Sequence, residues 1–308
     1  MHARFFGLLL LGLSFLNNSY AQYFEDDYIT TDIVTEAGAG IGIMNCLTDL
    51  GGNEGIGKKY FKDMNLGQSQ VSSGFYFGAM YRKMVGLRLE ATFGRVKGTD
   101  DVLSDVLSSD IAKTRYNRGL NFRSKITEFS LLTEVHPLFI FFNWENSDMA
   151  PPAISPYLLG GVGYFSFNPQ AELDGKMIDL QPLRTEGQGF KEYPDRQPYK
   201  LRQFNLPFGA GIKYNVSPII NIKGEVVYRK LNTDYLDDVS TTYVDPSLYE
   251  LNGFAGNKLL NAIRLNNRVR NGQEIYSGPG AKRGSPIEND SYFSFNLKVG
   301  IYLKQRMY

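Results

Sequence analysis

The sequence lacks most of the residues on which disulfide-rich, metal-dependent and nucleic-acid-binding proteins rely. It contains one cysteine, Cys46, and two histidines among 308 residues. A single cysteine excludes a disulfide within the chain, and so few cysteines and histidines do not supply a zinc site. Basic residues number 33 and acidic residues 32, with no long basic face. The sequence therefore predicts no cofactor, no metal site and no nucleic-acid partner.

The N-terminus has the order of residues that is typical of a secretory signal. Arg4 supplies positive charge, residues 5–16 are almost entirely apolar, and Ala21 ends a short polar stretch of small residues. The apolar block is too short for a transmembrane helix, which needs about 20 such residues. We expect residues 1–21 to be a cleaved signal peptide and residues 22–32 to form a periplasmic tail.

Long apolar runs are absent after residue 21, so no transmembrane helix is predicted there. Apolar and polar residues instead alternate with a period of two, which indicates strands with two different faces. In the last such segment Phe293, Leu297 and Ile301 lie on one face, while Asn296 and Lys298 lie on the other. Eight segments share this pattern: 33–45, 73–83, 85–97, 122–136, 155–167, 201–215, 218–231 and 292–304.

Glycines help to distinguish two architectures that such strands could build. In a soluble sandwich the apolar face is the core and the charged face is solvated. In an eight-stranded membrane barrel the apolar face meets lipid, while small and charged side chains fill the narrow interior. Gly38, Gly40, Gly42, Gly161 and Gly163 fall on the charged face, where a narrow barrel has least room. Each segment also reaches the roughly 9–11 residues that a tilted strand needs to cross a membrane.

The connections between the segments favour the barrel as well. Short and long connections alternate, as in outer-membrane barrels with short periplasmic turns and long outer loops. The exception is 137–154, whose apolar residues 138–142 we expect to extend the fourth strand. The short connections are at Met84 and 216–217, and the long ones are 46–72, 98–121, 168–200 and 232–291. We predict an all-β fold, an eight-stranded antiparallel transmembrane β-barrel over residues 33–308 in the outer membrane.

The polar face of the predicted strands carries six basic and five acidic side chains toward the barrel interior. Because buried charges must be paired, we interpret them as a network of ion pairs that fills and stiffens the barrel. An ion path is the alternative, but eight strands leave an interior just wide enough for side chains. The residues are Glu36, Arg82, Arg88, Glu90, Glu128, Glu134, Lys213, Lys223, Glu225, Arg229 and Lys298.

No catalytic site is apparent. After removal of the signal peptide, His136 is the only histidine, and it ends the predicted fourth strand directly before a proline. We expect it to be an interfacial residue and not a general base, so the protein is predicted not to be an enzyme. Cys46 is expected to be a small half-buried residue near a strand end, and an intermolecular disulfide is the alternative.

The long loops hold two further features. Residues 257–270 form a basic, loosely amphipathic stretch that predicts a helix within loop 232–291. Such a helix could cover the barrel, contact lipopolysaccharide or dock a partner. The aspartates at 234, 237 and 238 do not have the spacing of a calcium loop, and we interpret them as solvated charge.

Several loop motifs form a set that is more specific than any one of them. They are 167–169, 180–183, 185–189, 235–240, 243–246, 282–284 and 289–290, together with 122–124 in the fourth strand. Through these motifs the sequence resembles the PorG-like outer-membrane barrels of Bacteroidetes, over nearly all of the chain after the signal peptide. The stretch 248–285 is longer and more individual, so its role is the least transferable.

The resemblance implies a role in the type IX secretion system. The namesake of that family is an accessory outer-membrane subunit associated with a periplasmic ring of the lipoprotein PorK and its partner PorN. Our leading hypothesis is a non-catalytic barrel that anchors or organises this protein secretion and gliding machinery, in contact with outer-membrane lipid and lipopolysaccharide. The alternative is a stand-alone, adhesin-type barrel whose outer loops bind lipopolysaccharide or an extracellular ligand.

Overall fold

The computed structural model describes residues 32–50, 66–103, 110–142, 152–270 and 278–303. The signal peptide expected at 1–21, and the tail expected at 22–32 apart from Asp32, lie outside the described residues.

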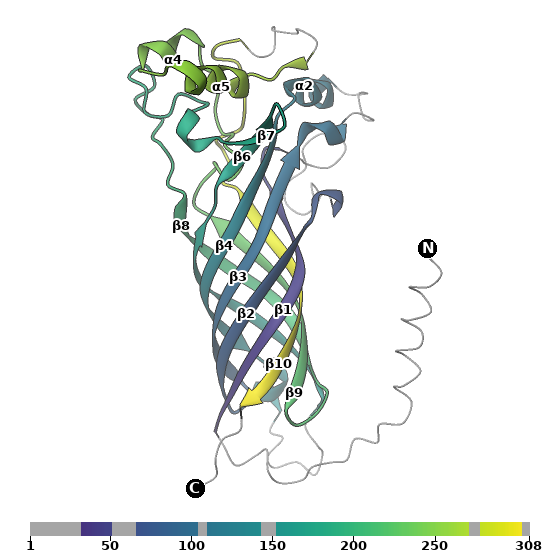
Figure 1. Ribbon diagram of the computed structural model, residues 1–308. Coiled ribbons are helices and arrows are strands. Elements are labelled where there is room, and N and C mark those ends of the chain that lie inside the picture. The colour runs from purple at the N-terminus through teal and green to yellow at the C-terminus, as the bar shows by residue number, and fades with distance from the viewer. Residues whose placement is uncertain (1–31, 51–65, 104–109, 143–151, 271–277, 304–308) are drawn as a thin grey trace, which may run out of the picture. The chain divides into compact units, whose positions relative to one another are not determined.

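Eight long strands form a closed antiparallel barrel, as the sequence predicts. Each strand pairs with its neighbours along the chain, and β1 closes the circle by pairing with β10 (Figure 1). The register is continuous, for example from Thr35 opposite Leu303 to Leu47 opposite Ser291. The strands are β1 Ile33–Leu47, β2 Gln70–Tyr81, β3 Val85–Thr99, β4 Asn121–Val135, β5 Ile154–Ser166, β8 Arg202–Asn215, β9 Ile220–Leu231 and β10 Ser291–Leu303.

The two faces of the barrel wall have opposite chemistry. Large apolar side chains point outward and are widely exposed, with Val71 at 78% and Phe204 at 71%. Charged side chains point inward and are buried, with Arg88 at 1% and Lys223 at 0%. A water-soluble protein would have the reverse arrangement, because apolar surface is driven out of water. The wall is therefore built for lipid outside and ion pairs inside.

Glycine is required where the interior is narrowest. A Cβ on Gly38 would overlap the Tyr76 ring and the Val299 carbonyl oxygen, and a Cβ on Gly161 would overlap the Leu131 carbonyl oxygen. Both glycines face the interior, as expected from the sequence. Their missing side chains allow neighbouring strands and the interior side chains to approach closely.

At one end of the barrel the β2–β3 and β8–β9 connections are short. The β2–β3 turn places Arg82 and Lys83 at φ values of 48° and 58°, in the left-handed region. The expectation that Arg82 lies inside the barrel is wrong: β2 ends at Tyr81, the alternation stops, and Arg82 is exposed in the turn. Between β8 and β9, Val216 and Ser217 donate backbone hydrogen bonds to the carbonyl of Ile220.

The expected extension of the fourth strand is also wrong. Residues Pro137–Phe141 form the short helix α3 after β4 ends at Val135. Proline has no N–H for the strand ladder but fits the first turn of a helix, so a change of structure at Pro137 follows from its chemistry. Among the described residues, no helix has the length and apolar character needed to cross a membrane.

The long connections gather at the other end and pack together (Figure 1). They contain a hairpin, β6 Pro169–Leu173 with β7 Lys176–Asp179, whose first strand pairs with β4. They also contain α2 Asp110–Arg118, α4 Ser247–Leu251, α5 Gly256–Asn266 and the 3₁₀ turns η2 Leu66–Gln68, η3 Asp100–Leu103 and η5 Gln181–Leu183. The helix predicted at 257–270 corresponds to α5, which ends at Asn266. We call the described parts of loops 48–69, 100–120, 167–201 and 232–290 the outer cap.

The outer cap has its own apolar core, continuous with the mouth of the barrel. Phe165 and Tyr292 at the ends of strands pack in one cluster with Phe190, Leu236 and Leu265 of the loops, all of them at most 1% exposed. Burial of this kind stabilises a structure by roughly 1.5–3 kcal/mol for each large side chain. The loops are therefore a folded layer over the barrel mouth, and the strand residue Phe165 belongs to its core.

Candidate functional site: the interior charge network and the outer cap

The interior network is centred on Arg88 of β3. Its Nη1 atom lies 2.6 Å from Glu134 Oε1 and 2.5 Å from Glu225 Oε1, and its Nε lies 3.0 Å from Glu90 Oε2. Because β3 and β9 are not neighbours, the contact with Glu225 crosses the interior from wall to wall. The ring of Tyr76 stands near this centre, 5.5 Å from the Arg88 guanidinium carbon.

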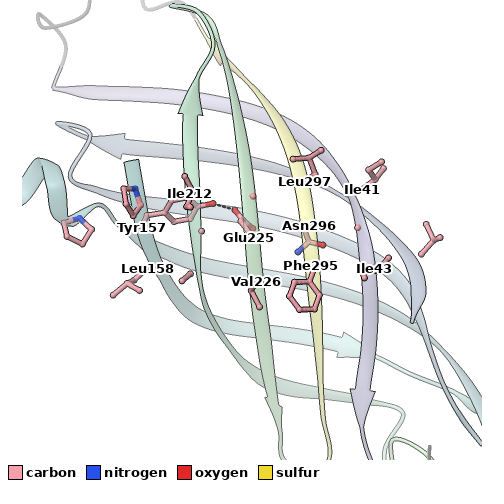
Figure 2. A pocket seen from close by; sticks show the side chains of 17 residues that line it. Ile41, Ile43, Tyr157, Leu158, Ile212, Glu225, Val226, Phe295, Asn296 and Leu297 are labelled. Carbon is pink, nitrogen blue, oxygen red and sulfur yellow. Dashed lines mark hydrogen bonds between the residues drawn. The ribbon is translucent and has the colours of Figure 1, made fainter. Parts of the chain in front are cut away.

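Two lysines extend the network from Arg88. Lys223 contacts Glu36 and lies 3.3 Å from Glu134, while Lys298 lies 2.7 Å from both Glu90 and Glu225. Further contacts complete this group of carboxylates. Lys213 lies 2.9 Å from Glu36. The Tyr157 hydroxyl donates a hydrogen bond to Glu225 (Figure 2).

A second cluster lies closer to the outer cap. Arg229 Nε lies 3.0 Å from Glu128, and its Nη1 donates to the Ser294 hydroxyl at 2.5 Å. The Tyr292 hydroxyl donates to Glu128 at 2.8 Å and accepts a hydrogen bond from Asn205 at 2.9 Å. The structure thus places ten of the eleven predicted charges inside the barrel and pairs each of the ten, whereas Arg82 lies in the β2–β3 turn. Paired charges that meet across the interior fill and stiffen it.

His136 lies deeper than the sequence suggests. The side chain is 1% exposed, its ring stacks on Tyr157 at 4.9 Å, and Phe139 of α3 packs edge-on against it. Nδ1 lies 2.8 Å from the hydroxyl of Ser155, whereas Nε2 lies 3.6 Å from Glu134, too far for a good hydrogen bond. The histidine is therefore a packed interior residue and not an interfacial one. Ser155 is itself 2% exposed, so a substrate has no access to this group as arranged.

The outer surface of the barrel wall near Tyr157 is apolar and contains a hollow (Figure 2). Leu158, Ile212, Val226 and Leu297 line the hollow from four different strands, and Gly224 leaves open space at its floor. The side chains face the region that lipid occupies, so the hollow belongs to the lipid-facing wall.

In the outer cap, Glu186 and Arg283 form a buried centre. Glu186 accepts hydrogen bonds from the backbone N–H groups of Ser240 at 3.0 Å and Thr241 at 2.8 Å, and from the Thr241 hydroxyl at 2.7 Å. Arg283 Nη1 lies 2.9 Å from Glu186 and donates to the Asp238 carbonyl at 2.6 Å. Loop 167–201 and two distant segments of loop 232–290 are joined at this point.

Aspartates surround this centre. Asp238 accepts hydrogen bonds from the hydroxyls of Tyr199, at 2.6 Å, and Thr185. Asp237 accepts the N–H of Leu50 at 3.0 Å, which ties the first loop of the cap to the last. Burial raises the pKa of Asp238 to about 6 and holds the pKa of Asp237 well above its usual value. The interpretation of these two aspartates as solvated charge is wrong, since both are fully buried.

The cap centre brings together motifs that the sequence presents as separate. Glu186 belongs to motif 185–189, Asp237 and Asp238 belong to motif 235–240, and Arg283 belongs to motif 282–284. The loop motifs that carry the family resemblance therefore build one hydrogen-bonded structure. Sequence reasoning found the motifs but not their mutual contacts. The described residues contain no group of three or more histidine, cysteine, aspartate or glutamate side chains placed to hold a metal ion.

The buried aspartates predict a pH-dependent cap. A carboxyl group with a raised pKa in the folded state stabilises that state fully below its unfolded pKa, and this stability is lost as pH rises through the folded pKa. For Asp238 this loss of stability runs from pH 3.8 to about 6. Burial raises the pKa of Asp234 to about 8, so for Asp234 the loss runs from pH 3.8 to about 8. We expect amide exchange of the cap, corrected for the intrinsic effect of pH, to slow between pH 8 and pH 5. Asp234→Asn should reduce this change, and equal protection at both pH values in the native protein would contradict the prediction.

Cys46 lies at the outer end of β1, half-buried, with its thiol donating to the Lys97 carbonyl at 3.6 Å. Its side chain packs against the apolar cluster of the cap. We expect a bulky maleimide to label the folded protein slowly and the urea-unfolded protein rapidly, because the thiol must leave this packing to react. A disulfide-linked dimer on a non-reducing gel of native membranes would instead support the intermolecular alternative.

The geometry defines the class of protein: an eight-stranded β-barrel of the outer-membrane type, closed inside by ion pairs and covered by a folded loop layer. The chain belongs to the family described as a domain of unknown function, DUF6089, whose model matches residues 30–251. A comparison with curated proteins gave no match.

Solved structures similar to this chain include outer-membrane barrels. Ail of Yersinia pestis, in complex with the heparin analogue sucrose octasulfate, has 10% identity and a TM-score of 0.38, covering 89% of this chain and 100% of that one. OprG of Pseudomonas aeruginosa has 12% identity and a TM-score of 0.37, with coverages of 88% and 96%. Outer membrane protein W of E. coli has 12% identity and a TM-score of 0.34, with coverages of 88% and 97%.

Proposed function

We propose that the protein is a non-catalytic, PorG-like barrel that anchors or organises the type IX secretion machinery at the outer membrane. The observation that carries this proposal is the convergence of the resemblance motifs on the cap centre of Glu186, Asp238 and Arg283. Motifs shared with PorG-like barrels would then specify the same folded cap, which is a rigid surface on which other subunits could assemble.

The filled interior supports an organising role over a transporting one. Ion pairs such as Arg88 with Glu225 join opposite walls, so a secreted protein has no route through this barrel. The protein would act through its surfaces: the cap on the outer side, and the β2–β3 and β8–β9 turns on the periplasmic side. A ring of PorK and PorN would meet the periplasmic turns.

The test is affinity purification of the tagged full-length protein from native membranes. We expect PorK, PorN or other secretion subunits to be recovered with it. A single cysteine placed at Arg82 or Ser217 should cross-link to the ring, whereas a single cysteine placed at Leu251 of the cap should not. The same preparation should begin at Gln22 if residues 1–21 are removed as a signal peptide. Recovery of the barrel alone, together with normal secretion after gene deletion, would overturn the proposal and favour the stand-alone barrel.

A further inference from the structure

Four basic residues lie together on the lipid-facing side of β3 and β4, at the outer end of the apolar wall. In the register of these adjacent strands (Figure 1), Arg95 lies opposite Lys125 and Lys97 lies opposite Arg123. All four alternate in phase with the outward-facing Phe93 and Phe129, so their side chains leave the wall on the outer surface. We call these four residues the basic quartet.

The quartet is electrostatically unfavourable in the protein by itself. Like charges directly opposite each other on neighbouring strands destabilise a sheet. Among the described residues, none of the quartet forms an ion pair, and the Nε atom of Arg123 is buried without a hydrogen-bond partner. On the adjacent hairpin, Asp179 instead accepts hydrogen bonds from Asn168 and Gln170, at 3.0 Å and 2.7 Å. No carboxylate in the described part of the chain neutralises the quartet, so the quartet is suited to bind an external anion.

The position of the quartet indicates which anion. Phe93, the last outward apolar residue of β3, is two residues before Arg95, a step of about 7 Å along a strand. The cations thus begin where the acyl chains of the outer leaflet end and the headgroups start. A ligand that fills this place presents phosphate to the quartet and hydrocarbon to Phe93 and Phe129, which are 39% and 59% exposed. A lipid has both parts in one molecule.

We propose that Arg95, Lys97, Arg123 and Lys125 form a binding site for the phosphorylated headgroup of lipopolysaccharide on the outer wall of the barrel. Two arginines and two lysines offer charge-assisted hydrogen bonds to phosphate oxygens, and the guanidinium groups can bind them in a bidentate manner. Phosphate would also relieve the repulsion within each cross-strand pair. The site lies on the barrel wall, outside the cap, and does not depend on the proposed role in secretion.

The experiment compares the full-length protein with the variant R95Q/K97Q/R123Q/K125Q in zwitterionic detergent. Diphosphorylated lipid A is the probe, and the variant R202Q/K230Q is the matched control. Arg202 and Lys230 are exposed at the outer ends of β8 and β9, where they lie opposite Ser166 and Ser291 and not opposite cations. We expect the quartet variant to bind lipid A at least about tenfold more weakly, and the control to bind as the native protein does. Without lipid, the quartet variant should be as stable as the native protein or more stable, because repulsion has been removed.

Two further probes identify the source of the phosphate. Dephosphorylated lipid A should bind the native protein and the quartet variant equally weakly, and inorganic phosphate should stabilise the native protein much less than lipid A does. Equal binding of lipid A by the native protein and the quartet variant would overturn the proposal. Stabilisation by inorganic phosphate alone, equal to that by lipid A, would overturn the assignment to a lipid.

Discussion

Replacing Arg88 by methionine should destabilise the barrel by about 3–5 kcal/mol. The guanidinium contacts Glu90, Glu134 and Glu225, all of them buried. Its loss leaves Lys223 and Lys298 as the remaining positive charges beside these three carboxylates. Removing one member of a buried ion pair costs about 3–5 kcal/mol, a large part of the roughly 5–15 kcal/mol that separates folded from unfolded states of a typical protein.

The measurement is unfolding by urea in detergent micelles, together with the heat-modifiable migration of the barrel on a gel. Arg202→Met is the matched control, because that side chain is exposed on the outer wall, and it should change the free energy of unfolding by less than about 0.5 kcal/mol. The double variant Arg88→Met, Glu225→Gln should be more stable than Arg88→Met alone, since one unpaired carboxylate is then neutral. A single variant as stable as the control would show that the network does not hold the barrel together.

The barrel could be predicted from sequence because its wall obeys a local rule. A side-chain period of two fixes which face each residue occupies, and lipid outside makes the faces easy to tell apart. The predicted segment 33–45 became β1 Ile33–Leu47, and the predicted charges Arg88, Lys223 and Glu225 face inward because each keeps the phase of its strand. The prediction for Arg82 was wrong because the alternation of faces ends with the strand, at Tyr81.

The outer cap could not be predicted in the same way, because its contacts join residues that are far apart in the chain. Glu186 and Arg283 are separated by 97 positions, and Asp237 and Leu50 by 187. A local pattern shows only that Asp237 and Asp238 are acidic and lie in a loop, and acidic loop residues are solvated in most proteins. That the four quartet residues share the apolar face could have been found from sequence, since alternation with a period of two fixes the face. Their pairing across β3 and β4 could not, because the long loop 100–120 does not set the register of the two strands.

Replacing Arg283 by methionine should unfold the outer cap while the barrel persists. Glu186 would remain fully buried with its hydrogen bonds to Ser240 and Thr241 but without its counter-charge, at a cost of about 3–5 kcal/mol. The barrel strands keep their own backbone ladders and the separate interior network, so the loss should be confined to the loops. Amide exchange in peptides covering 183–199 and 233–252 should then accelerate by about 100-fold or more, while peptides from β3 change little.

The chain supplies a matched control for this variant. Arg264 also pairs with an aspartate in the cap, Asp174 at 2.6 Å, but the two side chains are 50% and 67% exposed. Exposed ion pairs contribute little to stability because water and salt screen them, so Arg264→Met should leave exchange in the cap nearly unchanged. If both variants exchanged alike, the cap would owe its structure to its apolar cluster alone. If Arg283→Met also accelerated amide exchange in β3, the cap and the barrel would be one cooperative unit. The loop motifs would then stabilise the whole protein.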